Sequence, residues 1–272
     1  MRWALYAFFA VVILAQMPGE AEAVNFYDGA RAPEGLYLLT YTSFYTADDL
    51  TDSHGNTVKS DYGLSKAEEL LRFCYYTPNL VLTALAPFDY LEIDSRHQKS
   101  SGLGDISVGA GYFLPIKSVD ILPMLFIKLP TGKYDSTSAA NVGTGQYDIK
   151  PTVFLYKAFG DFSVDAAVKY FFRLENHDNH VSPGDELHLQ CLLGYNVTDR
   201  FKLGPSFNWM VSRDKKLNGV KVPNSARETF SAGADFYYRF SKFSVTFTYL
   251  YDAYAENSTK GSFFQLKTVF RF

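Results

Sequence analysis

The residues best suited to chemistry in this chain are two histidines, an aspartate and a serine that lie close together. His180 and Ser182 form a His-x-Ser pair, and His177 and Asp178 come just before it. A serine nucleophile requires a base held rigidly within hydrogen-bond reach and a third group that orients the base. The four residues fall in an expected loop beside a Pro-Gly pair, which provides no such frame. The sequence therefore predicts no catalytic residue, and we expect the protein not to be an enzyme.

Candidate sites for a metal or a cofactor are equally weak. His177, Asp178 and His180 offer metal-ligand atoms, but two histidines and one aspartate in a loop are usually solvated. Gly132 and Lys133 resemble the end of a phosphate-binding loop and lack its upstream glycine. The chain carries 26 Lys and Arg against 29 Asp and Glu, whereas nucleic-acid-binding proteins are basic and patchy. We expect no metal, no cofactor and no nucleic-acid partner.

A regular alternation of side chains dominates the chain instead. Residues 105–112 give the clearest case, because Asp, Ser and two Gly alternate with Ile, Val, Ala and Tyr. A period of two places the two sets on opposite faces of a β-strand. In residues 162–174 and 243–253, one face likewise carries charged or hydroxyl side chains and the other carries apolar ones. The alternation predicts strands whose two faces meet different surroundings.

The same alternation along the whole chain predicts the elements that position these residues. We expect about twelve antiparallel strands, at residues 35–45, 70–77, 80–93, 105–112, 119–129, 147–157, 162–174, 185–197, 201–212, 227–239, 243–253 and 261–272. Short turns alternate with longer polar loops, and an even number of strands places both ends of the mature chain on one side, as in outer-membrane barrels. Two strands are less clear: both faces of 35–45 hold apolar residues, and Pro87 is expected to interrupt 80–93.

The N-terminus has the parts of a secretory signal peptide. A basic start precedes an apolar stretch at residues 3–15, and Ala21 and Ala23 form an A-x-A cleavage site. The alternative is an N-terminal membrane anchor, but the apolar stretch is too short to span a bilayer as a helix. We therefore predict a signal peptide at residues 1–23 and a single mature domain at residues 24–272.

Composition favours a membrane barrel over a soluble sandwich. The chain contains 20 Tyr and 24 Phe, and no later apolar run approaches the roughly 20 residues of a spanning helix. A soluble antiparallel sandwich would also bury one face and solvate the other. Here, however, aromatic residues gather at the expected strand ends, where membrane barrels have interfacial girdles. Because a closed barrel is the only sheet that satisfies its backbone in lipid, we predict an all-β, antiparallel transmembrane β-barrel in the outer membrane of a Gram-negative bacterium, in contact with its lipid.

The closing strand ends the chain on an aromatic residue. Phe272 is the last residue, and Phe270 lies on the same face of the strand. A terminal Phe on an alternating strand resembles the closing-strand signal of bacterial outer-membrane barrels. We therefore expect Phe270 and Phe272 to act as an assembly signal for the barrel-assembly machinery.

The two cysteines of the chain fall on opposite faces of the expected wall. Cys74 has the parity of the lumen, and Cys191 has the parity of the lipid. Since they point to opposite sides of the wall, we predict that both are free thiols.

Three stretches of the chain resemble one family. They are residues 102–112 (GLGDISVGAGY), 129–135 (LPTGKYD) and 141–148 (NVGTGQYD). Together with the rhythm of the strands, they are similar to the MetA-pathway of phenol degradation family of outer-membrane transporters. The resemblance implies that small, often aromatic, compounds pass through a β-barrel, and it supplies no catalytic residues.

Residues expected to face the lumen are the candidates for a solute path. They comprise Arg72, Tyr76, Asp105, Lys128, Asp148, Lys150, Phe154, Tyr156, Lys169, Arg173, Asp235 and Arg239. Ion pairs that brace the barrel are the alternative role for any one of the charged residues. Both signs of charge occur in similar number, and no ring of like charge, which would select ions, is visible.

The expected lumen favours a transport function. Aromatic walls with a few polar groups suit small neutral or weakly charged ligands. We therefore predict a channel for the uptake of small solutes, chiefly hydrophobic or aromatic ones. The alternatives are an outer-membrane barrel enzyme, such as a lipase or protease, and a structural or adhesive barrel without transport.

Overall fold

The computed structural model describes residues 23–272, so the expected signal peptide lies outside the described residues except for Ala23. Twelve long strands form the wall in the described part of the chain, as the sequence predicts. They are β1 (Gly35–Thr51), β3 (Leu64–Tyr76), β4 (Leu80–Ile93), β6 (Ser107–Tyr112), β7 (Asp120–Lys128), β8 (Asp148–Phe159), β9 (Phe162–Arg173), β11 (Glu186–Asn196), β12 (Phe201–Ser212), β15 (Glu228–Arg239), β16 (Phe243–Glu256) and β17 (Thr259–Arg271). The shorter elements are β2 (Thr57–Lys59), β5 (Gln98–Leu103), β10 (Val181–Ser182), β13 (Lys216–Leu217), β14 (Val220–Lys221) and the 3-10 helix η1 (Asp94–Arg96).

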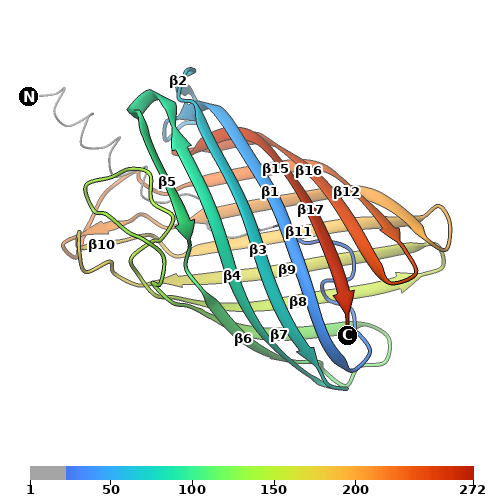
Figure 1. Cartoon of the computed structure of the whole chain (residues 1–272). Helices are drawn as coiled ribbons and strands as arrows, with labels where there is room; N and C mark the ends of the chain where they lie inside the picture. Colours follow the sequence, from blue (N-terminus) through green and yellow to red (C-terminus); the bar gives the residue numbers. More distant parts are fainter. Residues whose placement is uncertain (1–22) are drawn as a thin grey trace, which may run out of the picture.

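The long strands close into an antiparallel barrel (Figure 1). Each strand pairs with the next long strand along the chain, and β17 returns to pair with β1, where Tyr37 lies opposite Arg271. The backbone N–H of Phe272 donates to the carbonyl of Leu36 at 3.0 Å, so the C-terminus and the start of β1 lie at one end. The short turns lie at this end too, as predicted. By the convention of outer-membrane barrels it is the periplasmic end, and the long loops are extracellular.

Several strands extend further toward the extracellular end than the sequence predicts. β1 continues to Thr51 rather than residue 45, and β3 begins at Leu64 rather than residue 70. The two extensions pair with each other, with Ala47 opposite Leu64 at the last pair. Hydrogen bonds between the strands therefore order polar residues whose sequence pattern, taken by itself, predicts a loop.

Pro87 does not interrupt β4, so this sequence-based expectation is wrong. One edge of β4 pairs with β3 throughout, whereas the other edge pairs with β6 over residues 80–85 and with β5 over residues 88–93. Pro87 lies in the gap between β6 and β5, and its carbonyl accepts a hydrogen bond from Gly104 on that side at 2.9 Å. Since the missing N–H faces the same gap, proline removes no bond between strands there.

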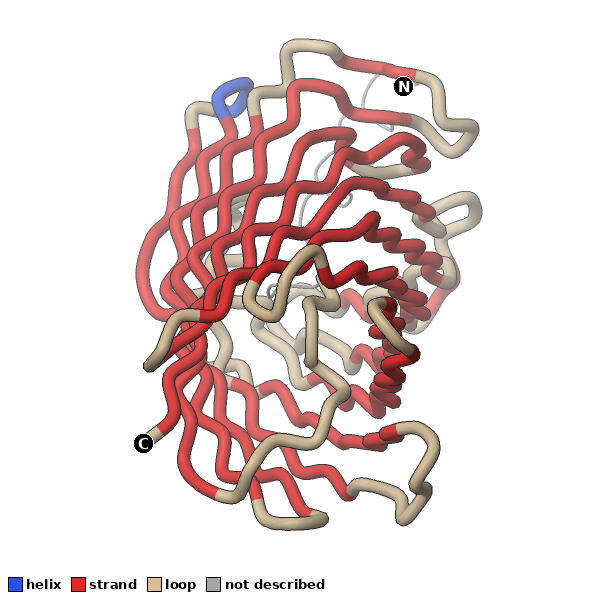
Figure 2. Tube along the Cα trace, turned by 90° about the vertical axis from the view of Figure 1, so that its right-hand side faces the viewer, coloured by secondary structure: helices blue, strands red, loops and turns tan. Residues whose placement is uncertain are grey.

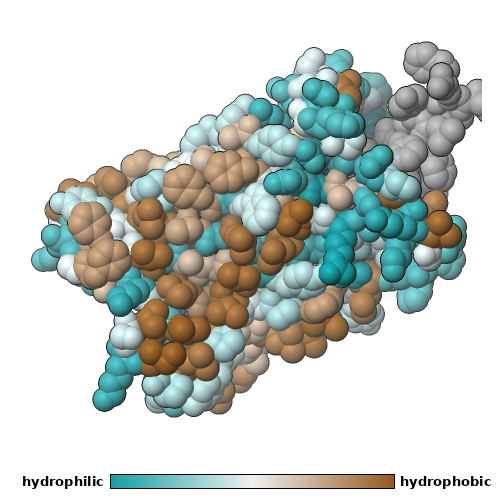
Figure 3. Space-filling view, turned by 180° about the vertical axis from the view of Figure 1, so that it is seen from behind, coloured by the Kyte–Doolittle hydropathy of each residue, from teal (hydrophilic) through white to brown (hydrophobic). Residues whose placement is uncertain are grey.

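The outer face of the wall is apolar, and hydrophilic residues gather toward the extracellular end (Figure 3). In β9, Val168 is 49% exposed whereas Asp165 is completely buried, which confirms the predicted parity of this strand. In β1, where the parity was unclear, Leu36 and Phe44 face outward and Tyr37 faces the lumen. An alternating sheet of this kind presents its exposed apolar residues to lipid.

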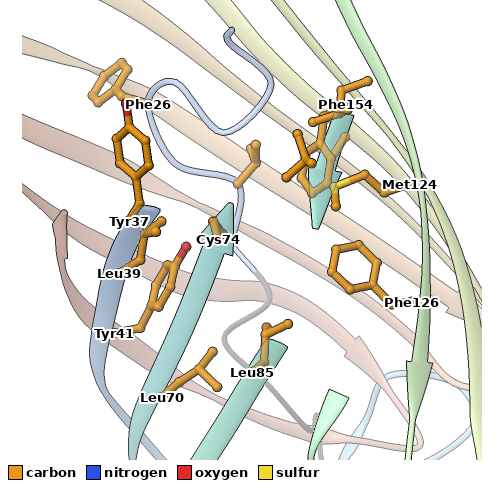
Figure 4. Packing of buried hydrophobic residues seen from close by; sticks show 14 of the residues in the cluster. Phe26, Tyr37, Leu39, Tyr41, Leu70, Cys74, Leu85, Met124, Phe126 and Phe154 are labelled. Atoms are coloured by element: carbon orange, nitrogen blue, oxygen red, sulfur yellow. The ribbon is translucent and has the colours of Figure 1, made fainter. Parts of the chain in front are cut away.

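The lumen is not uniformly polar. Buried apolar side chains from several strands and from the chain before β1 form one cluster, part of which is drawn in Figure 4: Phe26, Tyr37, Leu39, Tyr41, Leu70, Cys74, Leu85, Met124, Phe126 and Phe154. A water-filled porin has a polar interior. The lumen therefore combines an apolar part with the charged residues that the sequence predicts to face inward.

Both cysteines are free thiols, as predicted. Cys74 is completely buried in the apolar cluster, and Cys191 lies half-buried on the outward parity of β11. In residues 23–272, no helix is long and apolar enough to cross a membrane.

A charge on the outer face should destabilise the barrel more than the loss of a charge inside it. Val168→Arg places a cation among lipid-facing residues, which near the bilayer midplane costs about 2–4 kcal/mol. Lys169→Gln, at the neighbouring lumen-facing position, should cost less because the interior is polar there. Urea unfolding of the protein in lipid vesicles measures both. An equal or larger loss for Lys169→Gln would contradict the assignment of the two faces.

Candidate functional site

Residues 24–34, which precede β1, lie inside the barrel, and we term them the plug. Figure 2 shows loop segments within the ring of strands. Val24, Asn25 and Phe26 are at most 2% exposed, and Val24 and Phe26 belong to the apolar cluster of the lumen. The plug therefore packs against the wall as part of the core of the protein.

Lumen-facing acids hold the backbone and side chains of the plug. The side-chain amide of Asn25 donates to Thr248 Oγ1 at 3.0 Å and to Asp235 Oδ2 at 3.4 Å. The backbone N–H of Tyr27 donates to Asp165 Oδ1 at 2.6 Å. Acids that the sequence places in the lumen on β9 and β15 thus find their partners in the plug.

Two ion pairs attach the plug to opposite sides of the wall. Asp28 pairs with Lys267 of β17, and both side chains are almost completely buried. Arg31 pairs with Asp120 of β7 at 3.1 Å and also donates to the carbonyl of Pro78 at 2.8 Å, at the periplasmic turns. The plug therefore occupies the periplasmic part of the lumen.

The long loop at residues 129–147 covers the extracellular end, and we term it the cap. The carboxylate of Asp105 accepts hydrogen bonds from the backbone N–H groups of Gly132 at 2.9 Å and Thr144 at 2.8 Å. Gly132 and Gly143 pack so closely that a Cβ on either would collide with the other's backbone. These residues belong to the family-like motifs, and their role is to hold the cap on the barrel.

The inner side of the cap is apolar. Ala139 and Ala140 are buried among apolar residues of β1, β3 and β4, and Tyr45 packs at the edge of this group. A second loop, after β12, also turns inward. Its Lys215 is 3% exposed, and burial, together with the charge of Arg227, lowers the pKa of Lys215 to about 8. Two extracellular loops thus cover the mouth of the barrel.

A cavity lies inside the barrel, against the inner face of the wall. The cavity has a volume of about 140 Å³, which is room for several waters or a small solute. Ala23 borders it, and side chains from β1, β3, β11, β12 and β15–β17 form its walls. Its apolar lining includes Tyr45, Met210, Leu250 and Phe263, and its polar lining includes Ser43, Lys66, Glu68, Glu186, His188, Gln190, Asn208, Arg227, Ser231 and Asp252.

The cations on the cavity wall are each held by carboxylates. Lys66 Nζ lies 2.9 Å from Glu68 Oε2 and 3.2 Å from Asp89 Oδ1. On the other wall, Arg227 binds Glu186. Buried charges require such partners, because an unpaired charge would carry a large desolvation penalty. Each cationic lining residue described above is therefore paired with a carboxylate.

The twelve predicted path residues lie around the plug and the cap, and none of them lines the cavity. Asp235 and Tyr156 contact the plug, the latter with its ring centroid 5.5 Å from that of Tyr27. Asp105 holds the cap. Arg239 is exposed at the periplasmic rim and donates to a turn carbonyl at 2.8 Å.

The other predicted path residues make contacts inside the lumen. Lys128 Nζ lies 2.6 Å from Asp148 Oδ2, and Arg173 Nε lies 3.9 Å from the same oxygen. Arg72 lies over the ring of Phe126, 5.9 Å from its centroid. The remaining members, which are buried or half-buried, are Tyr76, Lys150, Phe154 and Lys169. Ion pairs that brace the wall, the alternative role stated for these charges, are therefore present.

Sequence reasoning missed the plug and the cavity. Residues 24–34 show no alternation, so nothing in them indicates a place inside the barrel. His188, Gln190 and Asn208 are recognisable as lumen-facing from their parity, but their grouping with Glu68 depends on closure of the barrel. The feature of the sequence that could have indicated the cavity is a set of uncharged amide side chains at inward-facing positions of neighbouring strands.

Solved structures with a similar fold are outer-membrane proteins. The COG4313 outer membrane channel from Pseudomonas putida F1 aligns with a TM-score of 0.83 at 21% identity, over 92% of this chain and 100% of that chain. The beta domain of the Bordetella autotransporter BrkA aligns with a TM-score of 0.59 at 10% identity, over 89% of this chain and 100% of that chain. The NanC porin aligns with a TM-score of 0.52 at 10% identity, over 86% of this chain and 100% of that chain. The fold is thus that of an outer-membrane β-barrel.

Comparison by sequence identifies the family. A search of curated proteins finds no match to the chain. The sequence profile of one family matches residues 47–268, which is most of the barrel and includes all three motif stretches. The chain belongs to the family described as "Putative MetA-pathway of phenol degradation".

Proposed function

We propose that this protein is an outer-membrane channel for the uptake of small apolar or aromatic solutes. The observation that carries the proposal is the cavity inside a closed transmembrane wall, with apolar and polar groups on its lining. Sites for small organic molecules are concave and largely apolar, with a few polar groups that orient the ligand. The channels and porins among the similar folds support the same conclusion.

The apolar part of the lumen favours apolar solutes over sugars or ions. Leu85, Leu122 and Phe126 are buried and point into the lumen, where a general porin would present polar groups to water. The charged path residues lie around the cap and the plug, and we propose that a solute passes them on its way through the lumen when the plug moves. Their pairing into ion pairs of both signs supports a path without strong selectivity for one ion.

An enzymatic function has less support. His180 Nδ1 lies 3.1 Å from Glu175 Oε1, and no hydrogen bond joins His180 to Ser182 in the described structure. The imidazole is also largely exposed, with 59% of the side chain accessible. A base for Ser182 would need to be held against that hydroxyl. We therefore propose a transport protein without catalytic residues.

The channel should admit an apolar aromatic dye through an outer membrane that otherwise excludes it. N-phenyl-1-naphthylamine fluoresces strongly once it enters a bilayer, and an intact outer membrane slows its entry. A Gram-negative host that expresses this protein should take up the dye several-fold faster than a host with an empty vector. Reconstituted liposomes should show little swelling with raffinose, because the lumen is narrow and partly apolar. Dye uptake equal to that of the empty vector would overturn the channel.

Removal of the buried anchor should loosen the plug. Lys267→Met leaves the Asp28 carboxylate without its cation, and breaking a buried pair in this way costs about 3–5 kcal/mol. We expect higher single-channel conductance in planar bilayers than for the wild type. Lys242→Met, which removes an exposed charge at a periplasmic turn, is the control and should conduct as the wild type does. Unchanged conductance for Lys267→Met would show that the plug does not limit passage.

We also propose that Phe272 acts in assembly through the barrel-assembly machinery. Its side chain is 75% exposed, so it contributes little to packing of the finished barrel. Deletion of Phe272 should nevertheless reduce the amount of heat-modifiable protein in outer-membrane fractions. Phe240→Ala, at another exposed Phe of the periplasmic end, is the control for lost aromatic surface. Equal yields for the deletion, the control and the wild type would remove the assembly role.

A further inference from the structure

One position on the outer face of the wall carries a carboxyl group. Glu69 on β3 lies between Glu68 and Leu70, which face the lumen and are 5% and 2% exposed. Phe73, which shares the parity of Glu69, is 47% exposed on the outer face. Glu69 therefore points toward lipid, where a charged side chain is unfavourable and an ionisable residue usually has a function.

Glu69 lies within the apolar band of the wall rather than at its rim. Its cross-strand neighbours on the outer face are Thr42 of β1 and Phe88 of β4. The next outward residue toward the extracellular end of β1 is Phe44, and the next one toward the periplasmic end of β3 is Leu71. At this depth a bilayer offers hydrocarbon and no hydrogen-bond donors. The partners of the carboxyl group must therefore come from protein.

Three threonines extend this position into a polar patch at the closing seam of the barrel, and we term Thr40, Thr42, Glu69 and Thr268 the seam patch. Thr42 Oγ1 donates to Glu69 Oε2 at 2.5 Å, and Thr40 lies opposite Thr268 of β17. In Figure 1, β17, β1 and β3 lie side by side on the near side of the barrel. Along the other long strands of the described chain, the outward residues at mid-strand are apolar or aromatic. Polar groups on the lipid side are thus gathered in one place.

The wall alone does not satisfy the carboxyl group of Glu69. Among residues 23–272, Thr42 supplies its one hydrogen bond, and no cationic side chain lies within ion-pair distance. A carboxyl group in hydrocarbon is stable when it is neutral, and a neutral carboxyl group donates one hydrogen bond as well as accepting others. The bond from Thr42 uses an acceptor site. The donor is left for a group outside this chain.

We infer that the seam patch is a dimer interface whose occupant is a second copy of this chain. A two-fold axis along the membrane normal brings the same residues of two copies together at the same depth. The two Glu69 carboxyl groups then donate to each other, with the threonine hydroxyls beside them. Such a pair is self-complementary, as an isologous interface requires. Hydrogen bonds between polar side chains join protein segments within membranes in this way. The dimer does not depend on the proposed channel.

The side chains around the seam patch allow two walls to approach. Ala67 on β3 and Ala86 on β4 face outward beside Glu69. Small residues at an interface within a membrane permit close contact between backbones. Phe44 and Phe73, which are 43% and 47% exposed, border the patch and present apolar area to the second copy. The interface thus has a polar centre and an apolar surround.

Cross-linking through a cysteine above the seam patch tests the dimer. Ser65→Cys places a thiol on the outward parity of β3, nearer the extracellular end, and leaves the patch intact. Leu187→Cys is the matched control, because it lies at the extracellular end of β11 on the opposite side of the ring, and Cys191 is present in both proteins. In isolated outer membranes treated with a short bismaleimide, Ser65→Cys should yield several-fold more cross-linked dimer than Leu187→Cys. Equal yields, or a product with the mass of a different protein, would overturn the inference.

Substitutions of Glu69 separate the interface from the fold. In the Ser65→Cys background, Glu69→Leu should lower the dimer yield several-fold, whereas Glu69→Gln should retain most of it because an amide also donates and accepts. Glu69→Leu places an apolar side chain against lipid, so its resistance to urea in vesicles should equal or exceed that of the parent. An unchanged yield in Glu69→Leu, or an equal loss in Glu69→Gln, would overturn the carboxyl pair. A less stable Glu69→Leu barrel would also contradict it, by assigning Glu69 to its own wall.

Dilution in lipid distinguishes a dimer from random encounters. Purified Ser65→Cys protein, with and without Glu69→Leu, is reconstituted in vesicles at decreasing protein-to-lipid ratios and then cross-linked. The dimer of the parent should persist to ratios several-fold lower than that of the Glu69→Leu variant. Coinciding dilution curves would overturn the inference, because random encounters do not depend on Glu69.

Discussion

The pairing of β17 with β1 is the interaction on which the rest of the structure depends. A sheet in lipid has no water to satisfy its edges, so each edge must find a strand. The register from Tyr37 opposite Arg271 onward supplies this pairing between the two ends of the wall. Once the sheet is closed, every strand has one face toward lipid and one toward a confined space. The outer face can then be apolar throughout, while the inner face must be filled or solvated.

Closure explains why the plug is part of the core. Asp165 and Asp235 are completely buried in a narrow lumen, where an unpartnered polar group would be costly. The plug supplies the backbone N–H of Tyr27 to one acid and the amide of Asn25 to the other. A segment of eleven residues reaches about 36 Å when extended, so residues 24–34 can span the lumen from the start of β1. The wall and the plug thus satisfy each other.

The sequence predicted those features that depend on neighbouring residues. Alternation with a period of two assigns Val168 and Lys169 to opposite faces without knowledge of the rest of the fold. The same alternation located most strands to within a few residues of their bounds in the structure. The plug could not be found in this way, because the contact of Asn25 with Thr248 joins residues more than 200 positions apart. The sequence could not predict that β4 continues through Pro87 either, because this depends on which strand lies beside that residue.

The two anchors of the plug differ in their access to solvent, and this difference decides which one holds it. The side chains of Arg31 and Asp120 are 33% and 23% exposed, so salt in the periplasm weakens their attraction. Those of Lys267 and Asp28 are 4% and 9% exposed, and counterions screen such a buried pair much less. At high ionic strength the buried pair of Lys267 and Asp28 therefore holds the plug more firmly than the pair of Arg31 and Asp120 does. The hydrogen bonds of Asn25 and Tyr27 to buried acids of the wall add to this salt-insensitive attachment.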